Sequence, residues 1–290
     1  MLSEPDPLFP DEPDVGRFSA ICKLLKDCCN VLPLADAVEQ LRNGSLPSRA
    51  ACITFDDGYA DNCTQALPVL QAHGLPATFF IATGFLNGGR MWNDTLIEAI
   101  RSAKRKTIDL DALGLGVLRI GTVNEKRQAL QKVIPHLKHK APVDRDRAVA
   151  MVVSECDPAS LPDDLMMTNS QLLAMRDGGM TIGAHTENHP ILASCDRSHA
   201  HEEIARGRET LEALLGQRVS MFAYPNGKID TDYTGEHVDI VRELGFDAAV
   251  TTNAGASDSS ADRFQLHRFT PWDRQPWRFG LRLAQNLARR

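Results

Sequence analysis

The chain has 290 residues, of which 43% are apolar and 24% are charged, and its 32 Lys and Arg against 38 Asp and Glu give a net charge of −6. This composition excludes a disordered chain, a collagen-like fibre and a small disulfide-stapled scaffold, and it lacks the basic excess that nucleic acid binding requires. No apolar run approaches the roughly 18 residues of a membrane-spanning helix, so we expect no integral membrane segment.

The N-terminal stretch to Val15 is acidic and rich in proline. Because it has neither a basic nor an apolar region at its start, it does not match a secretory signal peptide. We therefore expect a cytoplasmic protein, or an extracytoplasmic one if the true start lies further upstream. The seven cysteines form no C-x-x-C pair and are interpreted as free thiols of a reducing compartment; they are Cys22, Cys28, Cys29, Cys52, Cys63, Cys156 and Cys195.

Apolar residues recur at helical spacing over 16–29 and 33–43, and no strand-like run precedes them. A short apolar run then predicts a buried strand at 50–55, which is followed by a helix over 62–73 and a second strand at 77–83. The first part of the chain therefore begins an alternation of strands and helices.

Residues 88–165 interrupt this alternation with helix-like stretches, which we interpret as a helical insertion. Six buried strands separated by helices indicate a parallel α/β fold, either a barrel or a doubly wound sheet. After the insertion, strands are predicted at 180–186, 219–225, 246–252 and 264–270, and helices over 169–177, 197–215, 236–244 and 275–289.

Polar residues collect directly after three of the predicted strands, at positions 56–57, 185–190 and 224–227. In both candidate folds the carboxyl ends of parallel strands form one rim, and chemistry belongs in the loops on that rim. We therefore expect the three segments to meet.

Asp56 and Asp57 place two carboxylates side by side at the end of a buried strand. Two carboxylates in a partly buried pocket repel each other, and a bound cation relieves that repulsion. Adjacent residues at a strand end also point in different directions, so one can bind a metal while the other acts as a base. The alternative is an Asp-Asp-Gly turn that only caps the strand.

His185 and His189 are four residues apart, which allows both rings to meet on one side of a helical turn, and imidazoles suit Zn²⁺. Thr186 stands where the H-E-x-x-H motif has its glutamate, so a general base has to come from elsewhere, and Asp56 is the obvious supplier. Two histidines, one carboxylate and an open position match a catalytic zinc site. The alternative is a solvated loop with two unrelated histidines.

Further candidates are weaker on sequence alone. His267, in the predicted strand 264–270, is a general acid if it faces the rim and a core histidine if it does not. Four aromatic residues could offer flat faces to a sugar ring or pack in the core instead; they are Tyr59, Trp92, Tyr224 and Trp272.

These residues resemble the polysaccharide deacetylases, carbohydrate esterase family four. The family pattern T-F-D-D-G stands at 54–58, its H-[ST]-x-x-H stands at 185–189, and the resemblance spans about 50 to 270. It implies a distorted, incomplete (β/α) barrel of six to seven mostly parallel strands, with 1–290 forming a single catalytic domain around the insertion. It also implies that Asp56 is the catalytic base and that Asp57, His185 and His189 bind a divalent metal, for which we expect Zn²⁺.

The third family motif, R-x-P-[YW]-G, falls on 223–227, where Ala223 replaces the arginine and Asn226 replaces the aromatic residue. We hypothesise that Arg268 or Arg263 orients the base instead. The family's oxyanion donor would be the backbone N–H of Asn226, with Tyr224 and Pro225 beside the substrate. The family's Leu-x-His motif is matched only by the adjacent Leu266-His267.

We therefore expect a metal-dependent hydrolase that removes N-acetyl groups from an N-acetylated polysaccharide or oligosaccharide, such as an exopolysaccharide, and releases acetate. His267 would protonate the leaving amine. Two alternatives stay open: an amidase that acts on a small N-acyl or N-formyl metabolite or a sugar-lipid, and a catalytically silent carbohydrate-binding barrel. The expected partner is the glycan substrate, with no nucleic acid.

Overall fold

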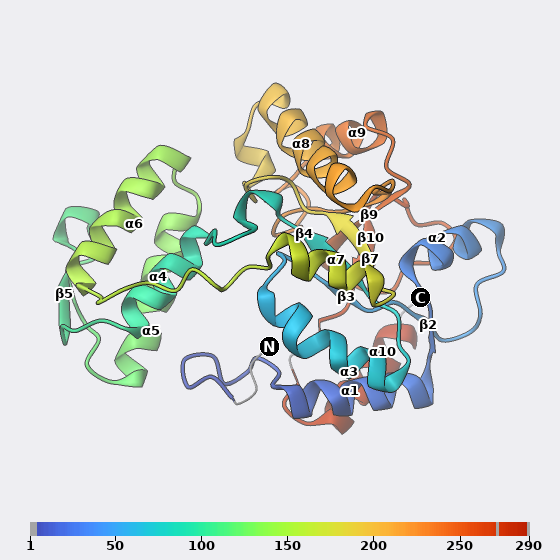
Figure 1. Cartoon of the computed structure of the whole chain (residues 1–290), viewed down its shortest axis with the longest axis horizontal. Helices are drawn as coiled ribbons and strands as arrows, with labels where there is room; N and C mark the ends of the chain where they lie inside the picture. The colour runs from blue at the N-terminus through green and yellow to red at the C-terminus, as the bar shows by residue number, and fades with distance from the viewer. Residues whose placement is uncertain (1–4, 271–272, 289–290) are drawn as a thin grey trace. The chain divides into compact units, whose positions relative to one another are not determined.

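The computed structural model describes residues 5–270 and 273–288, and for 287–288 it describes the backbone alone. The chain divides into two compact units (Figure 1). The sheet unit contains Asp11–Asn87 and the chain from Met166 onward, and the insertion unit contains Asp6–Pro10 and Gly88–Leu165. The predicted insertion thus has a core of its own, which also takes up a short N-terminal segment.

The sheet unit is built on six strands in the order β10-β9-β8-β7-β4-β3, and every neighbouring pair is parallel. The sheet curls into a half-barrel with helices around it, which confirms the predicted incomplete (β/α) barrel (Figure 1). Each predicted strand overlaps one of these six, and β9 runs two residues beyond its predicted end. The strands are β3 (Thr54–Phe55), β4 (Thr78–Ile81), β7 (Thr181–Ala184), β8 (Met221–Ala223), β9 (Ala248–Ala254) and β10 (Leu266–Arg268).

The helices of the sheet unit follow the predicted spacing. In the helix of 197–215, for example, the Asp196 side chain accepts from the His199 N–H at the start, and Gly216 ends it in the left-handed region (φ 65°). The predicted helix over 62–73 begins as a π-helical turn (Asn62–Ala66) before α3. The helices are α1 (Val15–Cys28), α2 (Leu34–Asn43), α3 (Leu67–His73), α7 (Asn169–Asp177), α8 (Arg197–Leu215), α9 (Gly235–Glu243) and α10 (Pro276–Ala288).

One sheet was not predicted. Strand β1 (Asn30–Val31) pairs in parallel with β2 (Ala50–Ala51), outside the six-stranded sheet. Two residues are too few for a period-2 pattern to register, so sequence reasoning left Asn30 and Val31 as a loop between two helices.

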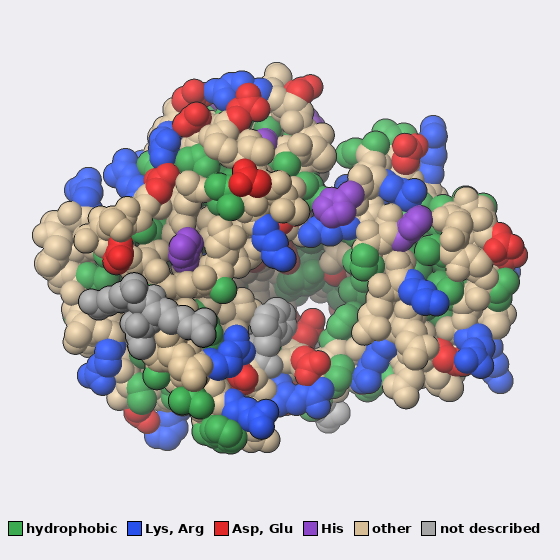
Figure 2. Space-filling view, turned by 180° about the vertical axis from the view of Figure 1, so that it is seen from behind, with side chains coloured by type: hydrophobic (Ala, Val, Ile, Leu, Met, Phe, Trp, Pro, Cys, Tyr) green, Lys and Arg blue, Asp and Glu red, His purple; other side chains and the backbone are tan. Residues whose placement is uncertain are grey.

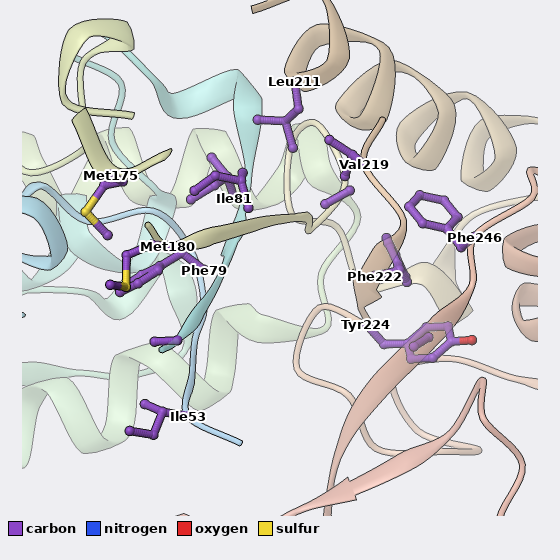
Figure 3. Close-up of a cluster of buried hydrophobic side chains, with 14 of the residues drawn as sticks. Ile53, Phe79, Ile81, Met175, Met180, Leu211, Val219, Phe222, Tyr224 and Phe246 are labelled. Atoms are coloured by element: carbon purple, nitrogen blue, oxygen red, sulfur yellow. The ribbon is translucent and has the colours of Figure 1, made fainter. Parts of the chain in front are cut away.

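Strand β4 contributes buried side chains to both faces of the sheet. All four of its residues are buried, as expected for a strand that is covered on both faces. Phe79 and Ile81 pack into the larger core, part of which Figure 3 shows, whereas Phe80 packs on the opposite face with Met221 and Val250. The alternating direction of successive side chains therefore builds two cores from one short strand.

The insertion unit contains three helices and an antiparallel hairpin, β5 (Thr107–Asp109) with β6 (Val117–Arg119). The helices are α4 (Trp92–Arg101), α5 (Val123–Lys138) and α6 (Pro142–Cys156), with a 3-10 turn at Asp111–Leu113. Its separate hydrophobic core includes Leu96, Val133 and Val152, all fully buried.

On the face drawn in Figure 2, acidic and basic side chains are interspersed. Among residues 5–270 and 273–288, no helix is both long enough and apolar enough to cross a bilayer.

Candidate metal centre and active site

The turn after β3 sends two consecutive carboxylates in different directions. Phe55 anchors the strand end by stacking on Phe79, with ring centroids 4.6 Å apart. Asp57 then adopts φ 75°, and Gly58 follows at φ 93°, where a Cβ would lie 3.2 Å from the Ile81 side chain. Glycine is required at that position because of both its backbone angle and its close neighbour.

His185 follows the end of β7, where its backbone N–H donates to the Ile81 carbonyl. Its ring is buried, and Nδ1 lies 2.7 Å from the Ala223 carbonyl oxygen. Since a carbonyl only accepts, Nδ1 carries the proton that is donated there. Nε2, which lies 3.4 Å from Asp57 Oδ1, is then the nitrogen available to a metal.

His189 reaches the same carboxylate oxygen from a tight loop. Its backbone lies in the left-handed region (φ 52°), as does that of Thr186 (φ 65°), and its N–H donates to the Thr186 hydroxyl at 3.0 Å. His189 Nε2 lies 3.3 Å from Asp57 Oδ1. Residues 185–189 therefore form a turn that points both imidazoles at one acidic side chain.

These three side chains fit a divalent metal. One ligand atom from each of Asp57, His185 and His189 lies within 4.8 Å of the other two. Zinc–nitrogen and zinc–oxygen bonds of about 2.0–2.1 Å in a tetrahedron place neighbouring ligand atoms about 3.3 Å apart. The 3.3 and 3.4 Å separations from Asp57 Oδ1 match that spacing.

The two histidines differ in their protonation behaviour. Burial lowers the pKa of His189 to about 4, so its imidazole is neutral near pH 7, as a metal ligand requires. Burial also opposes the charged form of His185, but the hydrogen bond to Asp57 and the charges of Asp56 and Asp57 outweigh it and raise that pKa. At His185 Nε2, a proton and a metal would therefore compete for the same position.

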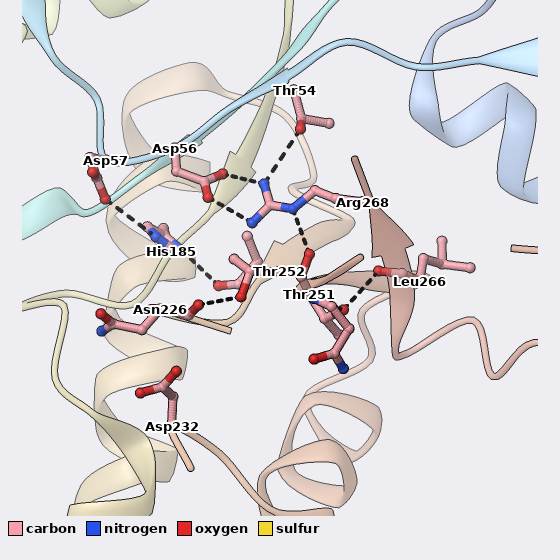
Figure 4. A network of polar contacts seen from close by, with 12 residues as sticks. Thr54, Asp56, Asp57, His185, Asn226, Asp232, Thr251, Thr252, Leu266 and Arg268 are labelled. Atoms are coloured by element: carbon pink, nitrogen blue, oxygen red, sulfur yellow. Dashed lines mark hydrogen bonds and ion pairs between the residues drawn. The ribbon is translucent and has the colours of Figure 1, made fainter. Parts of the chain in front are cut away.

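The neighbouring carboxylate has a different partner. Arg268, on β10, holds both oxygens of Asp56, with Nη1 to Oδ1 and Nη2 to Oδ2 each at 2.7 Å (Figure 4). Its Nε–H donates to the Thr251 carbonyl at 2.7 Å, so the guanidinium is itself held in place. Burial alone would raise the pKa of Asp56, but the Arg268 charge outweighs it and lowers that pKa.

Of the two arginines considered from sequence, the structure therefore brings Arg268 to Asp56. Arg263 instead lies over the Phe264 ring, with its guanidinium carbon 4.9 Å from the ring centroid. Arg268 occupies the position of the histidine in the family's Leu-x-His motif, since it stands two residues after Leu266. That spacing was the available signal for its location.

The loop after β8 carries Asn226 in a left-handed conformation (φ 59°). The Thr252 hydroxyl donates to the Asn226 carbonyl at 2.5 Å, and the Thr252 N–H donates to the Gly227 carbonyl at 3.0 Å. A Cβ at Gly227 would lie 2.8 Å from the Thr252 backbone nitrogen, so the loop lies directly on β9. Thr252 was not identified from the sequence, where it is one threonine among several in a strand.

Two expected substrate contacts are corrected. Tyr224 is 0% exposed, its ring is stacked 4.0 Å from that of Tyr233, and its hydroxyl donates to the Phe264 carbonyl. Pro225 is buried beside it. Neither side chain offers an open face to a sugar, because both residues are buried directly after the end of β8.

His267 lies on the same strand as Arg268 but has other neighbours. Successive residues of a strand face opposite sides, and Arg268 points toward Asp56. His267 is exposed, and its ring lies close to Gly255, where a Cβ would be 2.7 Å from Nδ1. Its role as general acid stays a prediction.

The remaining aromatic candidates are not decided by this geometry. Tyr59 is half-buried and forms a β-bridge with Met166. Trp92 belongs to the insertion unit, where the Arg145 guanidinium lies over its ring. Their contacts with substrate stay predictions, and Trp272 lies outside the described residues.

The fold and the site together define a class: an incomplete barrel of parallel strands that carries an Asp-His-His cluster at its strand ends. The sequence profile of the family described as polysaccharide deacetylase matches residues 43–108 and 148–249. These segments cover more than half of the chain, which therefore belongs to the polysaccharide deacetylase family.

Individual relatives agree with this assignment. YxkH of Bacillus subtilis (strain 168), which its name places among the polysaccharide deacetylases, is 22% identical over 254 residues; the match covers 87% of this chain and 63% of YxkH. Among solved structures, the deacetylase PplD of Streptococcus pyogenes has a TM-score of 0.62 at 19% identity, with 94% of this chain and 87% of PplD covered. IcaB of Ammonifex degensii has a TM-score of 0.60 at 19% identity, with coverages of 94% and 89%. At these identities the structures show a shared fold.

Proposed function

We propose that this protein is a metal-dependent hydrolase that removes N-acetyl groups from an N-acetylated polysaccharide or oligosaccharide and releases acetate. Membership of the polysaccharide deacetylase family supports this reaction class. The observation that carries the proposal is the pairing of two adjacent carboxylates with different surroundings. Asp57 faces two imidazoles at metal-ligand spacing, whereas Asp56 faces a guanidinium.

The residues divide the work of amide hydrolysis. Asp57, His185 and His189 would hold the metal, and a bound Zn²⁺ supplies Lewis acidity and an activated water. Asp56 acts as the general base that accepts a proton from the attacking water. Arg268 keeps this carboxylate ionised and fixes its orientation, while each carboxylate oxygen retains a second lone pair for the proton.

The backbone N–H of Asn226 is the donor we assign to the oxyanion that forms on the acetyl carbonyl. A backbone donor does not depend on the side chain, so the family's aromatic residue is not needed for this role. In the overall reaction a bond forms between the water oxygen and the carbonyl carbon, the C–N bond breaks, and the leaving nitrogen gains one proton in exchange for the one that Asp56 accepts. The products are acetate and the free amine of the sugar. Loss of one oxyanion donor typically costs about 3 kcal/mol of barrier.

Neighbouring structures support the substrate class by name only. The Streptococcus pyogenes deacetylase was solved in complex with acetate, and the BpsB protein of Bordetella bronchiseptica (TM-score 0.54, 18% identity) contributes a deacetylase domain. We carry the removal of an acetyl group over from them as part of the proposal.

The test is acetate release by the purified, zinc-loaded chain. Chitin oligomers, peptidoglycan fragments and poly-N-acetylglucosamine are offered beside small N-acetyl and N-formyl amines. The proposal expects release from at least one glycan and none after the metal is removed with a chelator. Release from the small amides alone would favour the amidase alternative, and binding without release would favour a silent carbohydrate-binding barrel.

A further inference from the structure

The loop that carries both histidines is held by a buried glutamate from a neighbouring helix. Glu203, on α8, is 4% exposed, and both of its carboxylate oxygens face Asn188. Oε2 accepts from the Asn188 backbone N–H at 2.7 Å, and Oε1 accepts from the Asn188 side-chain amide at 2.9 Å. Asn188 immediately precedes His189, so this contact acts on the backbone from which the second imidazole projects.

Helix α8 makes two more contacts with the same loop. The Glu203 backbone carbonyl accepts from the Glu187 N–H at 3.0 Å. One turn further along, a Cβ at Gly207 would lie 2.6 Å from the carbonyl carbon and oxygen of Thr186. Residues four apart share a helix face, so Glu203 and Gly207 present one surface to the loop.

A second element confines Asn188. The Gly84 N–H donates to the Glu187 carbonyl at 2.8 Å, and a Cβ at Gly84 would lie 2.5 Å from Asn188 Oδ1. The amide is thus oriented between Gly84 and the Glu203 carboxylate. Both ends of this turn, Thr186 and His189, have positive φ angles, which non-glycine residues keep only when their surroundings impose them.

We propose that Glu203 is a positioning residue of the metal centre: by holding Asn188, it fixes the backbone from which His189 presents Nε2. This inference rests on the proposed metal-dependent function. Removal of the carboxylate would take away the acceptor of both Asn188 donors, and the turn would lose the two hydrogen bonds that hold it against α8. Loss of an outer-shell partner typically weakens metal binding about 10- to 100-fold.

The experiment compares the Zn²⁺ affinity of four forms of the full chain: wild type, Glu203→Ala, Glu203→Gln and Glu209→Ala. Glu209 is an exposed glutamate on the same helix and controls for helix propensity and charge. Affinity is measured by competition with a chromophoric chelator, and the melting temperature and circular dichroism of each metal-free form report folding.

Glu203→Ala is expected to raise the Kd for Zn²⁺ about 10- to 100-fold, whereas Glu209→Ala stays within about twofold of wild type. Glu203→Gln should fall between them, because its amide oxygen still accepts from the Asn188 backbone while its NH₂ meets the other Asn188 donor. If Glu203→Ala does not fold, the Gln variant decides.

A folded Glu203 variant that binds Zn²⁺ as tightly as wild type would overturn the proposal, and so would a wild type without affinity for Zn²⁺. The readout is metal affinity and not acetate release. A wild type that binds Zn²⁺ but deacetylates no glycan would therefore contradict the proposed function and leave this inference to be judged by the affinities.

Discussion

Each of the two units of this chain contains a bidentate ion pair between an aspartate and an arginine. The two pairs have different surroundings. In the insertion unit, Arg101 holds Asp6 through Nη1 to Oδ1 at 3.0 Å and Nη2 to Oδ2 at 2.7 Å. In the sheet unit, Arg268 holds Asp56 through the same two nitrogens, each at 2.7 Å. The pairing by itself therefore does not distinguish a structural carboxylate from a catalytic one.

The difference lies in what else each carboxylate meets. Asp6 also accepts from the Leu8 backbone N–H at 2.7 Å, so it closes a local turn and ties the N-terminal segment to α4. Asp56 stands next to a second acid, Asp57, whose own partners are two histidines. A carboxylate that accepts from a backbone N–H as well as from an arginine stabilises the fold. A carboxylate that lies beside a cluster of metal-ligand type is available for chemistry.

The largest effect should come from a change in the Asp-His-His cluster, which lies in the sheet unit. His189→Ala removes one of three ligand atoms, and we expect Zn²⁺ affinity to fall by more than about 100-fold, beyond the usual loss from an outer-shell change. Acetate release should then fall to background. Elemental analysis of the purified variant measures the metal content, and a stoichiometry equal to wild type would contradict the assigned ligand set.

The next effect separates the two aspartates directly. Asp56→Asn keeps the size of the side chain but cannot accept the proton, and turnover should fall by about 10²- to 10⁴-fold while the metal is retained. Asp6→Asn is the matched control, because it breaks an equivalent ion pair and should leave kcat per folded molecule unchanged. Normal hydrolysis by the Asp56 variant would show that the base lies elsewhere.

Substitution of the two arginines, Arg268 and Arg101, tests whether the two ion pairs differ in function. A lysine keeps the positive charge but cannot make a bidentate ion pair. Arg268→Lys should therefore misorient Asp56 and lower kcat about 10- to 100-fold, with little change in KM. Arg101→Lys should lower the stability of the insertion unit and leave kcat unchanged. Steady-state kinetics beside denaturant unfolding separates these results, and equal kcat for both variants would remove the orienting role of Arg268.

The smallest effect is the stability contribution of the Asp6 pair. Burial alone would raise the pKa of Asp6, but the hydrogen bonds from Arg101 and Leu8 outweigh it and lower that pKa. A carboxyl whose pKa is lowered by folding contributes full stability above its unfolded value of about 3.9 and loses it as pH falls through the folded value.

Asp6→Asn should therefore lower the free energy of unfolding of the insertion unit by about 1–2 kcal/mol at pH 7, since Arg101 is partly exposed. The difference from wild type should shrink below about pH 4. Urea unfolding at pH 7 and at pH 3 measures both values, and a difference that grows on acidification would contradict the assigned direction.

Sequence reasoning went furthest where local pattern and tertiary outcome coincide. Asp57 follows one strand, and His185 and His189 follow another. Parallel strands bring their carboxyl ends to one rim, so the meeting of the three residues could be inferred from order along the chain alone. Arg268 was one of two options, and only the position of β10 beside β9 brought it to Asp56. The side on which a residue of a short strand falls depends on how that strand is placed, so the sequence left His267 open between the rim and the core.

Tyr224 and Glu203 show two opposite errors that sequence reasoning makes about burial. Tyr224 stands in a family motif, yet Tyr233 and Phe264 enclose it in the core. Glu203 belongs to no motif, and the sequence alone predicts an exposed acidic residue on a helix. In the structure, α8 places it in contact with Asn188, where it is buried. In both cases burial depends on elements distant in sequence, which periodicity does not register.

By itself the amino-acid sequence determined the alternation of strands and helices, the place of the insertion and the members of the Asp-His-His cluster, because these depend on side-chain period and on residue type directly after each strand. Only the tertiary structure decided which arginine meets Asp56, which aromatic residues are buried and which glutamate binds the histidine loop. Those outcomes are set by packing between segments far apart in the chain, and the strength of a charge pair or hydrogen bond depends on the surroundings that such packing creates.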